Sequence, residues 1–282
     1  MMLPINQLRD LSALFSRSEV RRWLKNDFKS IDVKLNRYHL LEKNKGSTYL
    51  SVLKKTYKIL ERQYPNEYIL KNEFLNQWLK KELGTTDSVL YSEFRIGKAI
   101  ADLAMFNGVS KVFEIKTILD KEYRLSNQLQ EYKKLFNEIY IIVPLEHLSK
   151  YIDYDFSVGL ITYDTQSRTF NRVRCSERNV QIDLDVIMQV LHTKEYLSIT
   201  KEYYNELPPM NAFNQFEICK ELIANIPIDV LNKMFLKVVK DRGIHNLFFN
   251  KINSEFNQIS LALNLKQKEK DQLIINLKSN TL

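Results

Sequence analysis

Two acidic residues and one lysine occupy neighbouring apolar segments in the middle of the chain. Asp102 lies inside AIADLAM, while Glu114 and Lys116 lie inside VFEIKT. Because strand residues alternate between the two faces of a sheet, Glu114 and Lys116 point the same way. Such side chains are almost never fully buried unless they are paired. A surface ion pair on an edge strand would account for Glu114 and Lys116, but it leaves the carboxylate of Asp102 among apolar residues unexplained.

A divalent metal ion would explain all three side chains together. Two carboxylates on adjacent strands repel each other unless a cation lies between them, and a hard ion such as Mg²⁺ or Mn²⁺ prefers their oxygen atoms. A nearby lysine can orient or deprotonate a water molecule, or stabilise negative charge on a phosphate. The sequence therefore predicts a phosphodiesterase site in which Asp102 and Glu114 bind the metal and Lys116 acts on the attacking water.

The elements that must position these residues are predicted from alternation, apolar runs and turn signals. Asn107-Gly108, between two apolar runs, is the strongest hairpin signal in the chain. A helix over about 126–137 leads into a fully apolar strand, which predicts a crossover and parallel pairing in a covered sheet. The middle of the chain is therefore predicted to be a mixed α/β sheet. Its predicted strands span 88–96, 99–107, 110–117, 139–144, 158–164 and, at an edge, 168–174.

Helices are predicted on both sides of this sheet. The tail 251–282 has the pattern of an amphipathic helix that could dock on the body of the protein or on a partner. Residues 28–48 are predicted to be irregular. The predicted helices span 5–27 as one or two pieces, 49–63, a longer helix that begins after Pro65-Asn66 and stops at Gly84, and several segments beyond 183. The chain is thus divided into a basic helical segment (1–64), the core (65–180) and a helical C-terminal region (181–282).

Composition and charge restrict the class of protein. The net charge is +8 with a pI of about 9.2, and residues 17–62 hold 13 Lys and Arg against 5 Asp and Glu. This asymmetry indicates either a nucleic-acid partner or a solvated basic surface. Two distant cysteines, no apolar run long enough to span a membrane and no signal-peptide pattern predict a cytoplasmic protein without a membrane partner. The four histidines lack ligand spacing, which disfavours a zinc site.

The pattern Asp102…Glu114-Ile115-Lys116 resembles the PD-(D/E)XK phosphodiesterase superfamily, which includes restriction endonucleases, Holliday-junction resolvases and RecB-type nucleases. Ala101 replaces the proline of the name. The segments RDLSALFS, NEYILKN, SEFRIGKAIADLAMFNG and EIKT are similar to those of a little-characterised bacterial group with the same core, over roughly residues 8–140.

The resemblance implies a restriction-endonuclease-like mixed sheet flanked by helices, a Mg²⁺ or Mn²⁺ cofactor, and hydrolysis of nucleic acid, DNA rather than RNA, in bacterial defence or DNA processing. The alternative is an inactive nuclease-like fold that serves as an immunity-type module and binds protein or nucleic acid. A homodimer, or a protein partner bound through the C-terminal helices, is also expected.

The superfamily often adds an acid from the helix that precedes the strands. Glu67 and Glu73 are the two candidates. Residues placed at 100° intervals put Leu70, Phe74, Leu75 and Trp78 on one apolar stripe, with Glu67 near its middle and Glu73 outside it. Glu67 is therefore expected to point inward as a third metal ligand. The alternative for Glu67 is a carboxylate favoured at a helix N-terminus by the helix dipole.

The helix that follows the strands carries Gln128 and Tyr132 one turn apart. This pair is similar to the Q-x-x-x-Y element of RecB-type nucleases, which implies that both residues flank the site and contact substrate or metal-bound water. The alternative is a partly exposed glutamine beside a core tyrosine.

Four basic residues flank the predicted site in sequence, and they are phosphate-contact candidates or ordinary surface residues. They are Arg95, Lys98, Lys121 and Arg124. Glu93 adds an acid before Asp102, for which a solvent-facing position is expected over an extra metal ligand.

Overall fold

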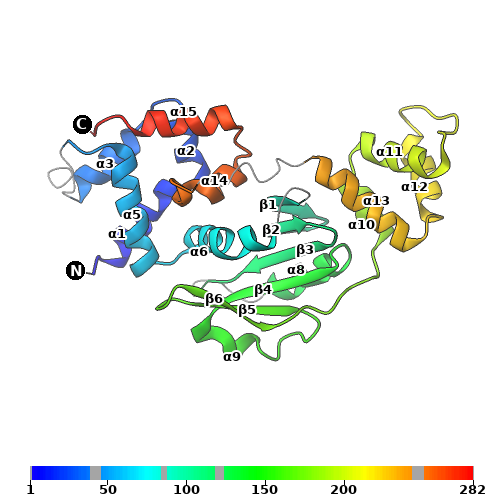
Figure 1. Ribbon diagram of the computed structural model, residues 1–282, viewed down its shortest axis with the longest axis horizontal. Coiled ribbons are helices and arrows are strands. Elements are labelled where there is room, and N and C mark those ends of the chain that lie inside the picture. The colour runs from blue at the N-terminus through cyan, green and yellow to red at the C-terminus, as the bar shows by residue number, and fades with distance from the viewer. Residues whose placement is uncertain (1, 39–45, 84–87, 118–123, 243–250, 282) are drawn as a thin grey trace. The chain divides into compact units, whose positions relative to one another are not determined.

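The computed structural model describes residues 2–38, 46–83, 88–117, 124–242 and 251–281. These residues form a six-stranded sheet in which the strands lie in sequence order (Figure 1). The strands are β1 (Val89–Ile96), β2 (Ala99–Phe106), β3 (Ser110–Ile115), β4 (Glu138–Pro144), β5 (Gly159–Asp164) and β6 (Thr169–Arg174). The predicted strands are confirmed with shifts of one or two residues at their ends.

The pairing of the strands confirms the predicted mixed α/β class. β1, β2 and β3 form an antiparallel meander, whereas β4 pairs in parallel with β3 and β5 pairs in parallel with β4. Gly97 (φ 51°) turns the chain between β1 and β2, and Gly108 (φ 92°) turns it between β2 and β3. Left-handed φ values of this kind favour glycine because it has no Cβ.

Helix α8 (Leu125–Lys133) makes the crossover from β3 to β4 and covers one face of the sheet. Its Leu125, Leu129 and Tyr132 pack in one core cluster with Ala101 of β2 and Val112 of β3. β4 is buried along almost its whole length, which explains why its sequence is a continuous apolar run. The short helices η4 (Leu145–His147) and α9 (Leu148–Tyr151) follow β4.

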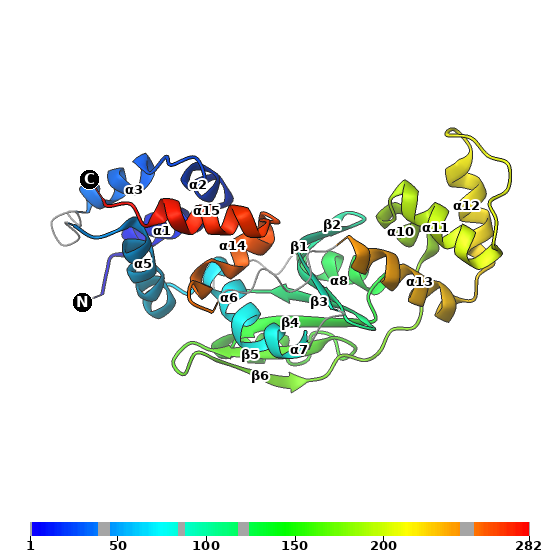
Figure 2. The ribbon, with the colours of Figure 1, turned by 45° about the horizontal axis from the view of Figure 1, so that its top comes forward.

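The chain divides into two compact units. Unit 2 comprises Leu83–Asp164 and Phe170–Asn246, and unit 1 comprises Met1–Glu82, Thr165–Thr169 and Leu247–Leu282. Unit 2 therefore holds the sheet together with four more helices, two of which contact β1 and β2 (Figure 2). These helices are α10 (Leu184–Val190), α11 (Thr193–Tyr204), α12 (Gln215–Ala224) and α13 (Ile228–Asp241).

In the described residues, the regular secondary structure of unit 1 is helical except for Thr169, the first residue of β6, and a single bridge between Thr48 and Asn280. The N-terminal helices are α1 (Ile5–Ser12), η1 (Ala13–Phe15), α2 (Arg17–Trp23), α3 (Lys29–Arg37), α5 (Tyr49–Gln63), α6 (Glu67–Phe74), η2 (Leu75–Leu79) and α7 (Lys80–Glu82). The C-terminal helices are η5 (Ser254–Phe256), α14 (Asn257–Ala262) and α15 (Gln267–Leu277).

The C-terminal tail packs on the N-terminal helices. Phe256 and Leu277 lie in one core cluster with Trp23 and Leu53. The Nδ2 of Asn276 donates to the backbone oxygen of Trp23 at 2.9 Å. The two contact units therefore differ from the three-part division predicted from the sequence, because the last helices return to the first.

Helix α3 corrects one prediction, since residues 28–48 were expected to be irregular. Ile31 and Leu35 lie one turn apart on α3 and are both buried in the core of unit 1. The spacing of Ile31 and Leu35 is hard to recognise in the sequence because polar residues surround it. Asp27 and Asn36 lie on either side, and Asp32 and Lys34 lie between the two apolar residues. Burial against the other helices stabilises a helix that its own propensity does not indicate.

Replacing Gly159 with alanine should destabilise unit 2. A Cβ at this position would overlap the ring of Tyr140 and lie 2.8 Å from the backbone nitrogen of Ser176. Overpacking of this kind costs about 1–3 kcal/mol of unfolding free energy, which urea denaturation measures. Gly108→Ala is the control, since its Cβ would meet open space and only the φ of 92° opposes it. An unchanged unfolding free energy for Gly159→Ala would show that Gly159 of β5 does not pack against Tyr140 of β4 as described.

Candidate active site

Strands β2 and β3 separate at Asp102, and its carboxylate fills the gap. Their backbone register ends at the pair Leu103–Phe113, so Asp102 and Glu114 face each other just beyond the last pair. The Oδ2 of Asp102 accepts a hydrogen bond from the backbone N–H of Ile115 at 2.8 Å. The carboxylate of Asp102 thus accepts a hydrogen bond that a backbone carbonyl oxygen would accept in a continuous β2–β3 ladder. This bond fixes the carboxylate at the point where the two strands separate.

An irregularity in β1 lies opposite Asp102. The β1–β2 register pairs Ser92 with Leu103 and then Phe94 with Ala101, so the ladder is interrupted at Glu93, whose φ is 58°, and continues in the same register. Ala101 and Ala104 both belong to the core cluster that contains residues of α8, although strict alternation would place them on opposite faces. Glu93 is exposed to solvent, as expected. No sequence signal indicates this interruption, because glutamate is not a residue that favours positive φ.

Glu114 is buried, with 4% of its side chain exposed, and three donors hold its carboxylate. The Nζ of Lys116 and the Nε2 of Gln128 donate to Oε1 at 2.9 and 2.8 Å. The hydroxyl of Tyr132 donates to Oε2 at 2.7 Å. Burial of this carboxylate is therefore compensated by one opposite charge and two neutral donors.

Lys116 is buried like Glu114, with 8% of its side chain exposed. Besides Glu114, its ammonium group donates to the Oε1 of Gln128 at 3.0 Å. The Gln128 amide therefore bridges the pair, donating to the carboxylate and accepting from the ammonium group. The structure confirms that Glu114 and Lys116 face the same side, and it places Gln128 on α8 between them.

Tyr132 is fully buried, and its predicted contact with nucleic acid stays a prediction. The hydroxyl instead lies 2.7 Å from Glu114 and 3.1 Å from the carbonyl oxygen of Ile100, and orients the carboxylate. Burial raises the pKa of Tyr132 above its ordinary range, with the charge of Glu114 second and that of Asp102 also contributing. Tyr132, Glu114 and Asp102 are thus close enough for the charges of the two carboxylates to affect the pKa of the tyrosine.

The charges and donor atoms of this cluster fit a hard divalent ion. Asp102 and Glu114 contribute two negative charges, and Lys116 contributes one positive charge. Mg²⁺ keeps several water molecules and is commonly held by one or two carboxylates. Among the residues that the structure describes, no group of three or more His, Cys, Asp or Glu side chains gathers at one point. The protein's described share of a metal site would therefore be the two carboxylates.

Glu67 does not point inward, which corrects the prediction made from the helical stripe. Its side chain is 56% exposed at the first turn of α6 and pairs with Lys71. Glu73 is the more buried acid, accepting from the hydroxyl of Tyr57 at 2.7 Å and from Gln77 at 2.6 Å. Burial raises the pKa of Glu73.

The prediction that Glu67 points inward was wrong for two physical reasons. Four consecutive residues of α6, Ile69 to Asn72, are buried, so this helix packs on more than one side. The π-helical turn of η2 then shifts the phase for the residues that follow. Glu67 belongs to unit 1, whereas Asp102 and Glu114 belong to unit 2. The role of Glu67 as a metal ligand stays a prediction.

A cavity of about 700 Å³ borders the cluster through Gln128. Two of the predicted phosphate contacts, Lys98 and Arg124, line it, and Ile100 gives it an apolar patch that is 42% exposed. Arg95 is exposed and lines a different hollow of about 620 Å³ that includes Glu93 and Arg242. Lys121 lies outside the described residues.

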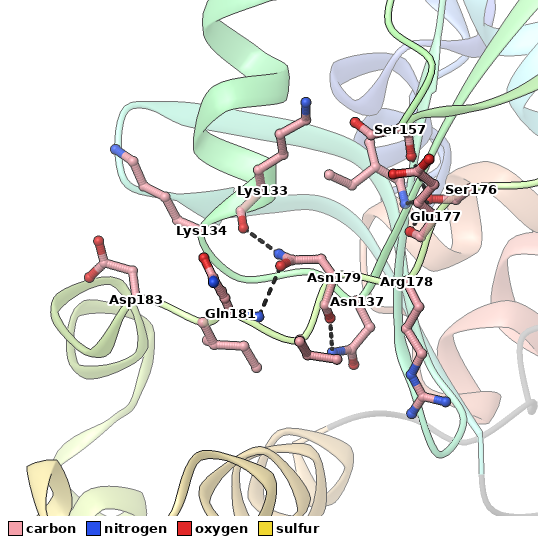
Figure 3. A pocket seen from close by; sticks show the side chains of 13 residues that line it. Lys133, Lys134, Asn137, Ser157, Ser176, Glu177, Arg178, Asn179, Gln181 and Asp183 are labelled. Atoms are coloured by element: carbon pink, nitrogen blue, oxygen red, sulfur yellow. Dashed lines mark hydrogen bonds between the residues drawn. The ribbon is translucent and has the colours of Figure 1, made fainter.

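Another cavity, of about 680 Å³, contains none of the predicted site residues (Figure 3). It lies where the segment before α10 covers the end of α8. Asn179 lies at its centre and donates to the backbone oxygen of Lys133, while Asn137 donates to the backbone oxygen of Asn179 at 3.0 Å. These polar groups form hydrogen bonds with one another, and the bonds attach the segment that contains Asn179 to the end of α8.

Replacing Tyr132 with phenylalanine should destabilise the protein by about 1–3 kcal/mol at neutral pH, because Oε2 of buried Glu114 loses its donor. The folded pKa of Tyr132 lies above the unfolded value of about 10, so the hydroxyl contributes fully below that pH. Its contribution is lost as the pH rises toward the folded pKa. The difference in urea-unfolding free energy between the wild type and Tyr132→Phe should therefore shrink above about pH 10.

Tyr154→Phe provides the matched control, since Tyr154 is exposed in the same unit and should tolerate the change. Equal stability of Tyr132→Phe and Tyr154→Phe at neutral pH would contradict the hydrogen bond to Glu114.

Comparison with known proteins places this site in a wider family. The profile of the family described as Bacteriophage P4 protein cII matches residues 60–265, which include Asp102, Glu114, Lys116, Gln128 and Tyr132. Protein cII of Enterobacteria phage P4 is 24% identical over 215 residues, which cover 71% of this chain and 78% of that protein. These names state no activity.

Among solved structures, a protein of unknown function from Silicibacter pomeroyi aligns at 15% identity and a TM-score of 0.33, over 49% of this chain and 92% of that chain. No described helix is long and apolar enough to cross a bilayer. The family match, by contrast, covers most of the chain, from the end of α5 to the residues just after α14, and on that match the chain belongs to the Bacteriophage P4 protein cII family.

Proposed function

We propose that this chain is a metal-dependent nuclease that hydrolyses phosphodiester bonds of nucleic acid, with DNA as the preferred substrate. The observation that carries the proposal is the convergence of Asp102, Glu114, Lys116, Gln128 and Tyr132 from two strands and one helix. A surface ion pair on an edge strand is a poor explanation, because β3 is an interior strand and the pair is almost fully buried.

Each residue has a distinct task in this proposal. Asp102 and Glu114 would hold Mg²⁺ or Mn²⁺, which when bound supplies Lewis acidity toward the phosphate and lowers the pKa of a water molecule. Lys116 orients the attacking water and stabilises negative charge on the phosphate. Gln128 holds the ammonium group of Lys116 through its Oε1. Tyr132 fixes the carboxylate of Glu114 from the protein interior.

The cavity beside Gln128 supplies a place for the nucleic-acid backbone. Lys98 and Arg124 on its walls would neutralise phosphates, which accounts for much of the affinity of proteins for nucleic acid. The side-chain amides of Asn127, Gln128 and Gln130 add uncharged donors and acceptors.

A second candidate function is a nuclease-like fold that binds protein or nucleic acid without cleaving it. The saturation of Glu114 favours it, because Lys116, Gln128 and Tyr132 already occupy both carboxylate oxygens. Titration calorimetry with MnCl₂ separates the two functions: the nuclease binds the ion with a stoichiometry that Asp102→Asn abolishes, whereas the binding module does not bind it.

The nuclease proposal is tested by incubating the full chain with supercoiled plasmid, linear duplex, single-stranded DNA and RNA, each with Mg²⁺, Mn²⁺ or EDTA. Cleavage that requires the metal is expected, with DNA cut faster than RNA. Intact substrates under every condition, in a preparation that binds them, would favour the binding module.

A further inference from the structure

Two short helices joined by a tight turn stand in unit 1, before the region that the family profile matches. α2 ends at Trp23 and α3 begins at Lys29. Between them Asn26 has a φ of 58°, and the backbone N–H of Asp27 donates to the carbonyl oxygen of Arg22 at 3.0 Å. A left-handed residue of this kind ends one helix and redirects the chain into the next. Helix–turn–helix elements present a second helix to DNA in this way.

The inner face of this element is fixed firmly to unit 1. Val20, Trp23, Ile31 and Leu35 are buried in its core. The ring of Phe28 stacks on that of Tyr49 at 4.2 Å between centroids. The hydroxyl of Tyr49 donates to Asp32 at 2.9 Å, and Asp10 of α1 pairs with Lys34 and Arg37. The two helices are therefore held in one orientation, with their outer faces in solvent.

The outer face of α3 carries side chains of the types that can read base edges. Lys29, Val33 and Asn36 are exposed and lie at helical spacing on one stripe, and the exposed Arg37 beside them pairs with Asp10. Asparagine recognises adenine, arginine and lysine recognise guanine, and an apolar side chain contacts the methyl group of thymine. Val33 is 53% exposed among polar neighbours, which a solvated face alone does not require.

The charges around this stripe favour phosphate. Residues 17–37 contain seven Lys and Arg against three Asp and Glu. The three acids are engaged: Glu19 accepts from Ser30, Asp27 pairs with Arg22, and Asp32 accepts from Tyr49. By contrast, Arg21, Lys25 and Lys29 are exposed and have no acidic partner among the residues that the structure describes.

We propose that α2, its turn and α3 form a docking surface for duplex DNA, with Val33 and Asn36 of the outer stripe of α3 in the major groove and Arg21, Lys25 and Lys29 on the phosphates. The rigid anchoring, the chemistry of the stripe and the unopposed positive charge each point to this occupant. The surface goes beyond the cleavage site, does not rest on it, and uses none of its residues.

The test measures binding of the full chain to a labelled duplex by fluorescence anisotropy, in EDTA so that no cleavage intervenes. The variant R21A/K25A/K29A removes three charges from the surface. The control K58A/K194A/K201A removes three exposed lysines that also lack acidic partners among the described residues. Each phosphate contact contributes about 0.9 to the slope of log affinity against log salt concentration, so the surface variant should reduce that slope by about 2.7. The control should leave the slope close to the wild-type value.

A second measurement tests the reading stripe. Selection of duplexes from a randomised pool should give the wild type a sequence preference, and Asn36→Ala should relax that preference at one position by about tenfold. R21A/K25A/K29A and Asn36→Ala should both retain the wild-type melting temperature, since the replaced side chains are exposed.

Three results would overturn the proposal. One is equal salt dependence for the surface variant and the control. Another is a loss of affinity for vesicles of phosphatidylglycerol in the surface variant without a loss for the duplex, which would identify an anionic membrane as the occupant. Preferential loss of RNA binding would likewise overturn duplex DNA. Cleavage activity does not enter any of these measurements, so failure of the nuclease proposal leaves the test intact.

Discussion

Replacing Asp102 with asparagine should abolish Mg²⁺-dependent cleavage while leaving the fold unchanged. The amide oxygen of asparagine can still accept the N–H of Ile115, so the local backbone keeps its hydrogen bond. The negative charge that would hold the metal is lost. Because a bound metal contributes several kcal/mol of transition-state stabilisation, the cleavage rate should fall by roughly 10³-fold or more.

The matched control is Asp153→Asn, an identical change at an exposed acid of the same unit. Plasmid cleavage by Asp153→Asn should equal that of the wild type, and both variants should melt at the wild-type temperature. Wild-type cleavage by Asp102→Asn would remove Asp102 from the site. Loss of the cooperative melt would instead show that its role is structural.

The second large effect is on stability. Replacing Lys116 with methionine keeps the length of the side chain but leaves the carboxylate of Glu114 buried without its opposite charge. Removing one partner of a buried ion pair costs about 3–5 kcal/mol, because the remaining charge is uncompensated. Urea unfolding of Lys116→Met in EDTA should show a loss of this size at neutral pH.

The double variant Glu114→Gln/Lys116→Met provides the discriminating comparison. Removing both charges leaves no uncompensated ion, so the double variant should be more stable than Lys116→Met alone. An additive loss from the two substitutions, or a cost for Lys116→Met below about 0.5 kcal/mol, would show that the pair is exposed in solution.

Much of the fold could be predicted because local signals and tertiary structure agree in the sheet. The Asn107-Gly108 turn fixes the β2–β3 hairpin, and the continuous apolar run of β4 reports burial on both faces. The alternation of VFEIKT placed Glu114 and Lys116 on one face, where the structure has them. Gln128 and Tyr132, one turn apart on α8, then reach the same carboxylate.

The remaining features depend on contacts that no local pattern contains. Glu67 was expected to point inward because one apolar stripe was assumed, but α6 is buried on several sides and its acid is exposed. The β1–β2 ladder is interrupted at Glu93, which has a positive φ, and glutamate gives no signal for it. The return of α15 to α2 joins residues more than two hundred positions apart, and only packing determines it.

A crystal soaked in MnCl₂ tests the central claim most directly, since the anomalous signal of manganese locates the ion without assumptions about activity. The nuclease account predicts one ion bound by an oxygen of Asp102 and an oxygen of Glu114, at about 2.1 Å from each, with water at the remaining positions. The same soak of Asp102→Asn should show no ion there. An empty site in the wild type, with Glu114 still held by Lys116, Gln128 and Tyr132, would contradict the account and leave the binding module as the function of this fold.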